Sequence, residues 1–259
     1  MSGLDPTERI RVERVVKRYR GEAVLDGVDL VLRAGEVVGI IGPGGEGKSV
    51  LLKHLPRLVA PDQGRVLVDG RDLATLAPRA LAKVRERFGY VFQNYALFDF
   101  MTVGDNVAFP LRQLDDVTRP APGEIQARVR QRLADVGLER AFAQYPRELS
   151  GGMKKRVGLA RATIADPEIA LYDDPSAGLD PVTSSKIFAL IDAMHARVPG
   201  ATTVVVSHDI DRMRAICHRW VMIARGKVVF DGTDADLRTA QQSVRAFVDF
   251  DAGLAGGSA

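Results

Sequence analysis

A glycine-rich loop at residues 42–49 constrains the fold of this chain more than any other stretch. It follows a β-branched run at residues 36–41 and precedes an apolar run at residues 50–55. A strand, a glycine loop and a helix in this order are typical of a phosphate-binding loop. The glycines let backbone N–H groups turn toward an anion, and the helix start adds its partial positive charge. The loop consists of Gly42, Pro43, Gly44, Gly45, Glu46, Gly47, Lys48 and Ser49.

Lys48 and Ser49 carry the side-chain chemistry of such a loop. A lysine at this place reaches the β- and γ-phosphates of a nucleoside triphosphate, and the hydroxyl that follows binds Mg²⁺. The alternative is an ordinary glycine turn with a solvated lysine, but the flanking strand and helix argue against it. We therefore predict a nucleoside triphosphate site.

Composition and charge exclude several other classes of protein. The chain of 259 residues fits one large domain or one domain with an inserted subdomain. A net charge of +3 is too small to argue for nucleic acid, and no apolar run reaches the length of about 18 residues that spans a membrane. The first residues lack the pattern of a secretory signal, and the single cysteine, Cys217, favours a reducing compartment. We expect a cytoplasmic location.

Strands and helices alternate on both sides of the loop, which predicts an α/β core with a mostly parallel sheet. We expect strands at residues 10–16, 23–32, 36–41, 65–68, 88–93, 169–172, 202–206, 220–224 and 227–231. We expect helices from the loop to about residue 59, with Pro56 ending or kinking the first, and at 77–87, 124–136, 154–164, 183–198, 209–217 and 234–250. Residues 94–118 show no regular pattern, and 94–164 read as an inserted helical subdomain.

Two adjacent carboxylates follow the predicted strand at residues 169–172. Asp173, at the end of that strand, would face Ser49 and help to hold Mg²⁺. Asp174 is the candidate general base for an attacking water molecule. The alternative is a pair of loop carboxylates before a proline, and the immediate neighbours alone favour that alternative.

Ser150, Gly151 and Gly152 open the predicted helix at 154–164 and offer donors to a second anion. A plain helix cap explains the serine equally well. His208 follows the strand at 202–206, at the sheet edge where ligands usually bind, although a lone histidine is more often structural.

Aromatic and amide side chains complete the set of candidates. Gln93 ends a predicted strand, where it is placed to sense a γ-phosphate or its magnesium. Tyr19 is either an adenine-stacking residue or a surface tyrosine, and spacing alone favours the surface. The irregular stretch 94–118 is rich in aromatic residues, which form either core or a partner-binding patch. The four that we single out are Tyr95, Phe98, Phe100 and Phe109.

These residues, taken in this order, resemble the ATP-binding cassette (ABC) family over residues 19–232. The most specific stretch is Leu-Ser-Gly-Gly-Met at 149–153, which is similar to the family's signature sequence. The resemblance implies a P-loop NTPase fold within one nucleotide-binding domain, 1–259. We expect a RecA-like core with an antiparallel β subdomain at 1–93 and 165–233, a helical subdomain at 94–164, and a C-terminal helix and tail at 234–259.

The resemblance also implies ATPase activity, with ATP and Mg²⁺ bound. It implies that Tyr19 stacks on adenine and that the residues from Gly42 to Val50 hold the phosphates. Gln93 belongs to the matching Q-loop, Asp173 ends the matching Walker B strand, and His208 matches the switch histidine. The implied metal ligands are Ser49, Gln93 and Asp173. The implied catalytic residues are Lys48, Gln93, Asp174 and His208.

The family pairs two cassettes head to tail, which implies a homodimer with ATP between Lys48 of one copy and Ser150 of the other. Three groups of residues, 48–54, 96–99 with 106–111, and 152–157, are similar to the ATPases of Mla/Mce-type lipid transporters. That similarity implies a permease in the inner membrane, contacted from about Asn94 to Leu111, a partner with an MCE domain, and lipid cargo. It places the chain peripherally on the cytoplasmic face of that membrane, with no nucleic-acid partner.

Two positions depart from the family pattern. Gly44 stands where the family usually has serine, and Asp174 stands where its catalytic glutamate is usual. A carboxylate shorter by one methylene predicts slow or differently relayed hydrolysis. Three other functions remain open: the ATPase of another importer, for example of a polar amino acid, a cassette ATPase acting on nucleic acid or ribosomes, and an ATP-binding switch with little turnover.

Overall fold

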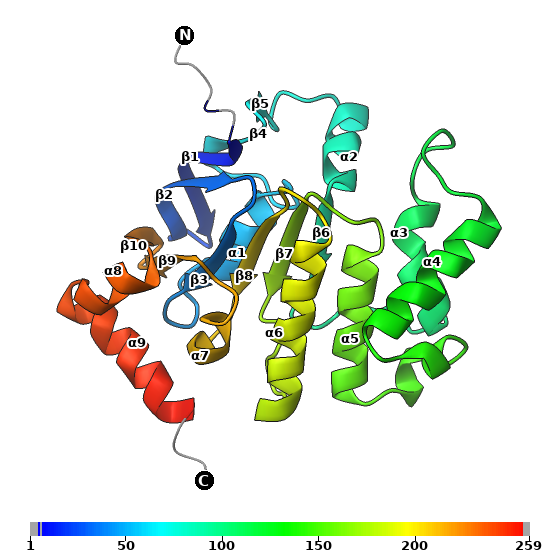
Figure 1. Cartoon of the computed structure of the whole chain (residues 1–259). Helices are drawn as coiled ribbons and strands as arrows, with labels where there is room; N and C mark the ends of the chain where they lie inside the picture. The colour runs from blue at the N-terminus through cyan, green and yellow to red at the C-terminus, as the bar shows by residue number, and fades with distance from the viewer. Residues whose placement is uncertain (1–4, 6, 256–259) are drawn as a thin grey trace.

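The computed structural model describes residues 5 and 7–255, and two sheets organise them (Figure 1). The central sheet has six strands in the order β10-β9-β3-β8-β7-β6, and its strands are parallel except for β10. Its strands are β3 (Val37–Ile41), β6 (Phe88–Val91), β7 (Ile169–Asp173), β8 (Thr202–Val206), β9 (Arg219–Ala224) and β10 (Lys227–Gly232). The second sheet is antiparallel, in the order β2-β1-β4-β5. Its strands are β1 (Glu8–Tyr19), β2 (Glu22–Arg33), β4 (Gln63–Val68) and β5 (Arg71–Asp72).

Helices cover the central sheet. In Figure 1, α5 and α6 stand beside it, α3 and α4 lie beyond α5, and α8 and α9 lie at the opposite end of the molecule. The helices are α1 (Lys48–His54), α2 (Pro78–Glu86), α3 (Val103–Arg112), α4 (Pro122–Asp135), α5 (Gly151–Thr163), α6 (Pro181–Ala196), α7 (Ile210–Met213), α8 (Asp234–Thr239) and α9 (Gln242–Ala255). Two 3₁₀ turns, Glu139–Ala141 and Pro146–Glu148, precede α5.

Alternating side chains of the parallel strands build two apolar cores. All five residues of β3, β7 and β8 are buried, as expected of parallel strands covered on both faces. On one face, Val38 and Ile40 pack in a cluster with Leu51 and Leu52 of α1 and with the antiparallel sheet. On the other face, the neighbouring residues of β3 pack with α3, α4, α5 and α6. The phosphate-binding loop joins β3 to α1, so both of its ends are anchored in these cores.

The predicted α/β class, with its antiparallel β portion and mostly parallel sheet, is confirmed. The division at 1–93, 94–164, 165–233 and 234–259 stays a prediction, and residues 1–4, 6 and 256–259 of it lie outside the described chain. Within the described ranges, no helix combines the length and the apolar content that a bilayer crossing requires.

Several predicted element boundaries were wrong. The helix after the loop ends at His54 and not near residue 59, because Pro56 has no N–H to continue the helix, as expected, and Arg57 then adopts a left-handed backbone with φ of 55°. The helix expected at 209–217 is a single turn, α7, and the one expected at 234–250 breaks at Ala240, where ψ is 169°. The irregular stretch 94–118 contains a helix, α3, whose N-terminus is capped by the Thr102 side chain.

Candidate nucleotide site

The loop between β3 and α1 has the shape of an anion cradle. A Cβ added at Gly42 would lie 2.0 Å from the carbonyl oxygen of Ile223, and one at Gly47 would lie 2.6 Å from that of Val24. Both residues also have positive φ, so only glycine fits there without strain. Gly44 and Gly45, in contrast, face space in which an added Cβ meets no heavy atom within 4 Å. The loop backbone is thus packed tightly against Ile223 and Val24 at Gly42 and Gly47, and it is open at Gly44 and Gly45.

Lys48 lies at the centre of this cradle. Its side chain is buried, and its Nζ donates hydrogen bonds to the carbonyl oxygens of Gly42 at 2.6 Å and Pro43 at 2.7 Å. The loop therefore encloses the ammonium group of Lys48. This arrangement places a positive charge where a triphosphate would lie against the backbone N–H groups.

Ser49 and Asp173 meet across the site, as expected from the sequence. The Ser49 hydroxyl donates to Oδ1 of Asp173 at 2.6 Å, and the Tyr90 hydroxyl donates to Oδ2 at 3.5 Å. Burial raises the pKa of Asp173, while the Ser49 hydrogen bond and the charge of Lys53 oppose that rise. A hydroxyl and a carboxylate side by side form a hard oxygen donor set, which suits Mg²⁺. The described residues contain no cluster of three histidine, cysteine or acidic side chains that would hold a softer metal.

A cavity of about 330 Å³ joins the cradle to the edge of the central sheet. It brings together Gly44, Gly45, Gly47, Lys48, Ser49, Val50, Gln93, Asp173, Asp174 and His208, all of which the sequence singled out. Val206 of β8 also lines it, and no sequence pattern distinguishes this valine from its neighbours. Gly42, Pro43 and Glu46 support the loop from outside the lining: the Glu46 carboxylate accepts a hydrogen bond from the backbone N–H of Arg225.

Asp174 is held by the end of β8. Its backbone N–H donates to the carbonyl of Val206 at 2.8 Å, and its Oδ1 accepts from the Ser207 hydroxyl at 3.2 Å. Its backbone is left-handed, with φ of 50°, a conformation that aspartate tolerates better than most residues. Ser207 was missed at the sequence level, where only its position before His208 marks it. His208 itself is exposed at the mouth of the cavity.

The remaining candidates lie outside the lining of this cavity in the described chain. Tyr19 ends β1 with its ring 45% exposed, and the Lys17 ammonium lies 5.5 Å from the ring centroid. Ser150 caps α5, and its hydroxyl accepts from the Met153 N–H at 3.3 Å. With Gly151 it is exposed at the start of that helix, while Gly152 is half-buried. A single copy of the chain thus brings the phosphate loop and the carboxylates together and leaves Ser150 apart.

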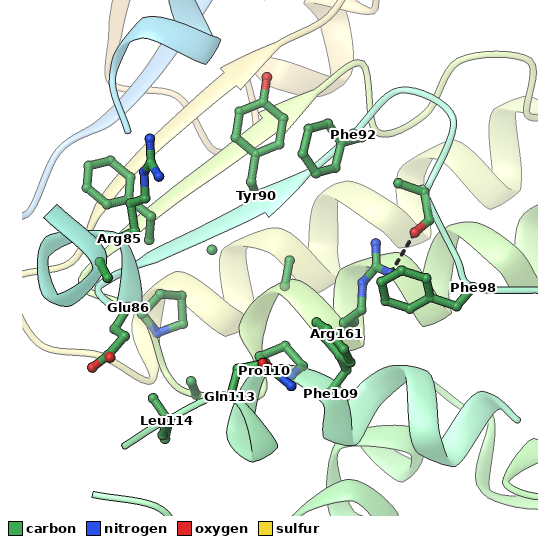
Figure 2. A pocket seen from close by; sticks show the side chains of 17 residues that line it. Arg85, Glu86, Tyr90, Phe92, Phe98, Phe109, Pro110, Gln113, Leu114 and Arg161 are labelled. Carbon is green, nitrogen blue, oxygen red and sulfur yellow. Dashed lines mark hydrogen bonds between the residues drawn. The ribbon is translucent and has the colours of Figure 1, made fainter. Parts of the chain in front are cut away.

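A second, larger and more apolar cavity of about 590 Å³ opens between α2, β6, α3 and α5 (Figure 2). Tyr90 and Phe92 stack with ring centroids 4.3 Å apart on one side, and Phe98 and Phe109 lie 4.8 Å apart on the other. Of the four aromatics predicted for this region, Phe98 and Phe109 line the cavity. Phe100 is 77% exposed beside Phe98, at 5.8 Å between ring centroids. Below we call this cavity with Phe100 the aromatic groove.

Comparisons with known proteins agree with this arrangement. The family model described as ABC transporter matches residues 25–177. The methionine import ATP-binding protein MetN of Caulobacter vibrioides is 40% identical over 92% of this chain and 72% of its own length. The probable ribonucleotide transport ATP-binding protein mkl of Mycobacterium tuberculosis is 39% identical over 91% of this chain, which spans 64% of that relative.

Solved structures give the same result. The dimeric ATP-binding cassette MJ0796, in a post-hydrolysis state with ADP and Pi bound, superposes with a TM-score of 0.80. It is 33% identical and covers 86% of this chain and 98% of its own. CbiO1 of Clostridium perfringens, part of the ABC transporter complex cbiONQ, gives a TM-score of 0.78 at 29% identity over 93% of this chain and 94% of its own. The chain therefore belongs to the ABC transporter family, as an ATPase that uses ATP and Mg²⁺.

Proposed function

We propose that this ATPase drives the movement of phospholipid or another lipid through a separate inner-membrane permease that works with an MCE-domain partner. The observation that carries the permease contact is the aromatic groove, an apolar surface built apart from the nucleotide cavity. Similarity of residues 48–54, 96–99 with 106–111, and 152–157 to lipid-transporter ATPases supports the choice of cargo. In this proposal the chain is peripheral, on the cytoplasmic face of the membrane, and acts on no nucleic acid.

Within the nucleotide site, we assign one role to each side chain. Ser49, Asp173 and Gln93 would hold Mg²⁺, which would supply neutralisation of the phosphate charge. Lys48 stabilises the charge that develops on the transferred group. Asp174 accepts the proton of the attacking water, and its hydrogen bond from Ser207 orients the carboxylate. His208 donates to the terminal phosphate from the mouth of the cavity.

We propose that two copies pair head to tail to complete each site. The exposed N-terminus of α5 carries Ser150 and Gly151 away from the cavity of its own chain, so these donors are available to a second copy. Pairing sets Ser150, Gly151 and Gly152 of one copy against the phosphates held by Lys48 of the other. Tyr19 stacks on the adenine. The dimeric state of the similar cassette MJ0796 supports this arrangement.

The aromatic groove is the proposed permease contact, from about Asn94 to Leu111. Its lining combines aromatic rings from β6, α3 and the loop between them with the side chains of Arg85, Glu86 and Arg161 at its edges (Figure 2). Aromatic residues supply large contact areas and dominate many interfaces. An apolar segment of the permease flanked by polar residues matches this surface.

Phe100→Glu should reduce recovery of the permease at least tenfold when the tagged chain is purified from detergent-solubilised native membranes, a loss of about 1.4 kcal/mol or more. The phenyl ring is 77% exposed, so its replacement leaves the fold and the ATPase activity of the isolated chain intact. Val117→Glu is the matched control, because Val117 is 94% exposed in the loop after α3, outside the lining of the groove. Equal recovery with both variants would place the contact elsewhere.

A second candidate function is amino-acid import, which the 40% identity to a methionine import protein favours. Purification of the tagged chain from native membranes distinguishes the two candidates, since the proteins that co-purify with the permease identify it. Recovery of a polytopic permease with an MCE-domain protein supports lipid transport. Recovery of a permease without an MCE-domain protein, with ATPase activity that responds to an amino acid and not to lipid, supports import.

Asp174→Glu should raise kcat for ATP, by up to about tenfold, because the longer side chain brings the carboxylate closer to the water that it activates. The left-handed backbone at this residue opposes the gain, since it accepts glutamate less readily than aspartate. The measurement is steady-state ATP hydrolysis by the purified chain, with the thermal midpoint as a check on folding. An unchanged or lower kcat in a folded variant would show that the aspartate is no handicap.

A further inference from the structure

Lys155 of α5 is a buried cation outside the nucleotide cavity. Its side chain is only 3% exposed, and its Nζ donates a hydrogen bond to the carbonyl oxygen of Ala177. The same ammonium lies 5.6 Å from the ring centroid of Tyr95. One side chain thus contacts two segments that are far apart in the sequence, the loop that follows Gln93 and the loop that follows Asp174.

The first of these segments, Tyr95 and Ala96, is fastened to α5. Both residues have left-handed backbones, with φ of 60° and 48°. Arg161 holds them by donating to the Tyr95 carbonyl at 2.6 Å and the Ala96 carbonyl at 2.7 Å. A Cβ at Gly158 would lie 3.5 Å from Cβ of Tyr95, so the tyrosine rests on the helix there. Residues 155, 158 and 161 are spaced by three, which brings them to neighbouring positions on the helix surface.

The second segment is the tight turn from Asp174 to Ala177. The Ala177 N–H donates back to the Asp174 carbonyl at 3.3 Å, and the Asp174 N–H is fixed to Val206 at 2.8 Å. Ser176, inside the turn, is buried. The Ala177 carbonyl therefore belongs to the same hydrogen-bonded turn as the backbone that carries the Asp174 carboxylate.

We propose that Lys155 is a positioning residue for ATP hydrolysis. Its ammonium group holds the Ala177 carbonyl and packs on the ring of Tyr95, and these contacts fix the position of the Asp174 carboxylate. The proposal rests on the general-base role assigned to Asp174 above. Arg161 and Phe98, next to Tyr95, line the aromatic groove (Figure 2). The hydrogen bonds from Arg161 to the carbonyls of Tyr95 and Ala96 thus lie between that groove and Lys155.

The charge balance around Lys155 fits this role. Burial lowers the pKa of its ammonium group, and the negative charge of Asp174 opposes that change. A buried cation that lost its partners would leave an uncompensated charge, so the contacts to Ala177 and Tyr95 are expected to be maintained. The electron-rich face of the Tyr95 ring favours the cation at this distance.

The test is Lys155→Met, an apolar side chain of similar length that removes the ammonium donor. We expect kcat for ATP to fall about tenfold, less than the roughly 100-fold that a 1 Å misplacement of the carboxylate can cost. KM for ATP should stay unchanged, because Lys155 does not line the nucleotide cavity in the described chain. Lys155→Arg, which keeps the charge and the donors, should recover most of the rate. Lys186→Met, on the exposed face of α6, is the matched control.

A double-mutant cycle with Tyr95→Leu separates positioning from simple packing. Tyr95→Leu keeps apolar bulk and removes the ring, so we expect it to lower kcat by itself and to add little to Lys155→Met. An unchanged kcat in folded Lys155→Met, or equal losses in Lys155→Met and Lys155→Arg, would overturn the proposal. If Lys155→Met does not fold, an unchanged kcat in Tyr95→Leu would overturn it. Asp174→Asn, measured alongside, distinguishes failure of this inference from failure of the general-base assignment, because it tests that assignment alone.

Discussion

Replacing Lys48 with alanine should abolish ATP turnover, with kcat lowered at least about 100-fold, the loss expected when one preorganised electrostatic donor is removed from an active site. The ammonium group is buried inside the loop and bonded to the carbonyls of Gly42 and Pro43. Alanine removes the positive charge from the cradle and leaves those two carbonyl oxygens without their donor. The site then lacks the cation that attracts the phosphates, so ATP binding weakens as well.

Lys186→Ala is the control, because Lys186 is an exposed lysine on α6. Both variants are measured by phosphate release and by ATP binding at equilibrium. Normal turnover in folded Lys48→Ala would show that the glycine loop is not part of the catalytic site. That result would also contradict the roles assigned to Ser49 and Asp173, since their positions are interpreted relative to this lysine.

The α/β class was predicted from the glycine loop at residues 42–49 together with the alternation of strands and helices on both sides of it. A buried strand before a glycine loop and a helix after it admits few architectures, and both ends are anchored in the core as that pattern requires. The pair of Ser49 and Asp173 was predicted as well, although 124 residues separate them. That prediction succeeded because parallel strands end at a common sheet edge, where side chains from distant parts of the chain meet.

Tertiary contacts explain what the sequence did not reveal. Helix α3 was missed because its polar start and Pro110 hide the helical period, whereas the cap at Thr102 and burial of Val103, Val107 and Leu111 form the helix. Val206 lines the cavity, and Ser207 donates to Asp174, only because β8 lies beside β7. No local pattern reports that a lysine in α5 reaches Ala177. The aromatic groove is likewise a product of packing, since its rings come from separate elements.

Asp174→Asn should lower kcat by about 10²–10⁴-fold, the usual contribution of a positioned general base. Asparagine keeps the shape of the side chain and, like aspartate, accepts the left-handed backbone found here, so the turn to Ala177 is preserved. Its amide oxygen still accepts from the Ser207 hydroxyl, which holds the group in place. The variant therefore removes proton-accepting capacity and little else, and ATP binding should remain.

The measurement is single-turnover hydrolysis with binding recorded separately, and Asp192→Asn, an exposed aspartate on α6, is the control. Retained binding with lost hydrolysis would identify Asp174 as the base. Equal single-turnover hydrolysis in Asp174→Asn and in the unmodified chain would mean that another group takes the proton. An increase of kcat in Asp174→Glu, together with the loss in Asp174→Asn, would show that the reach of this carboxylate sets the rate, because the first change lengthens the carboxylate and the second removes it.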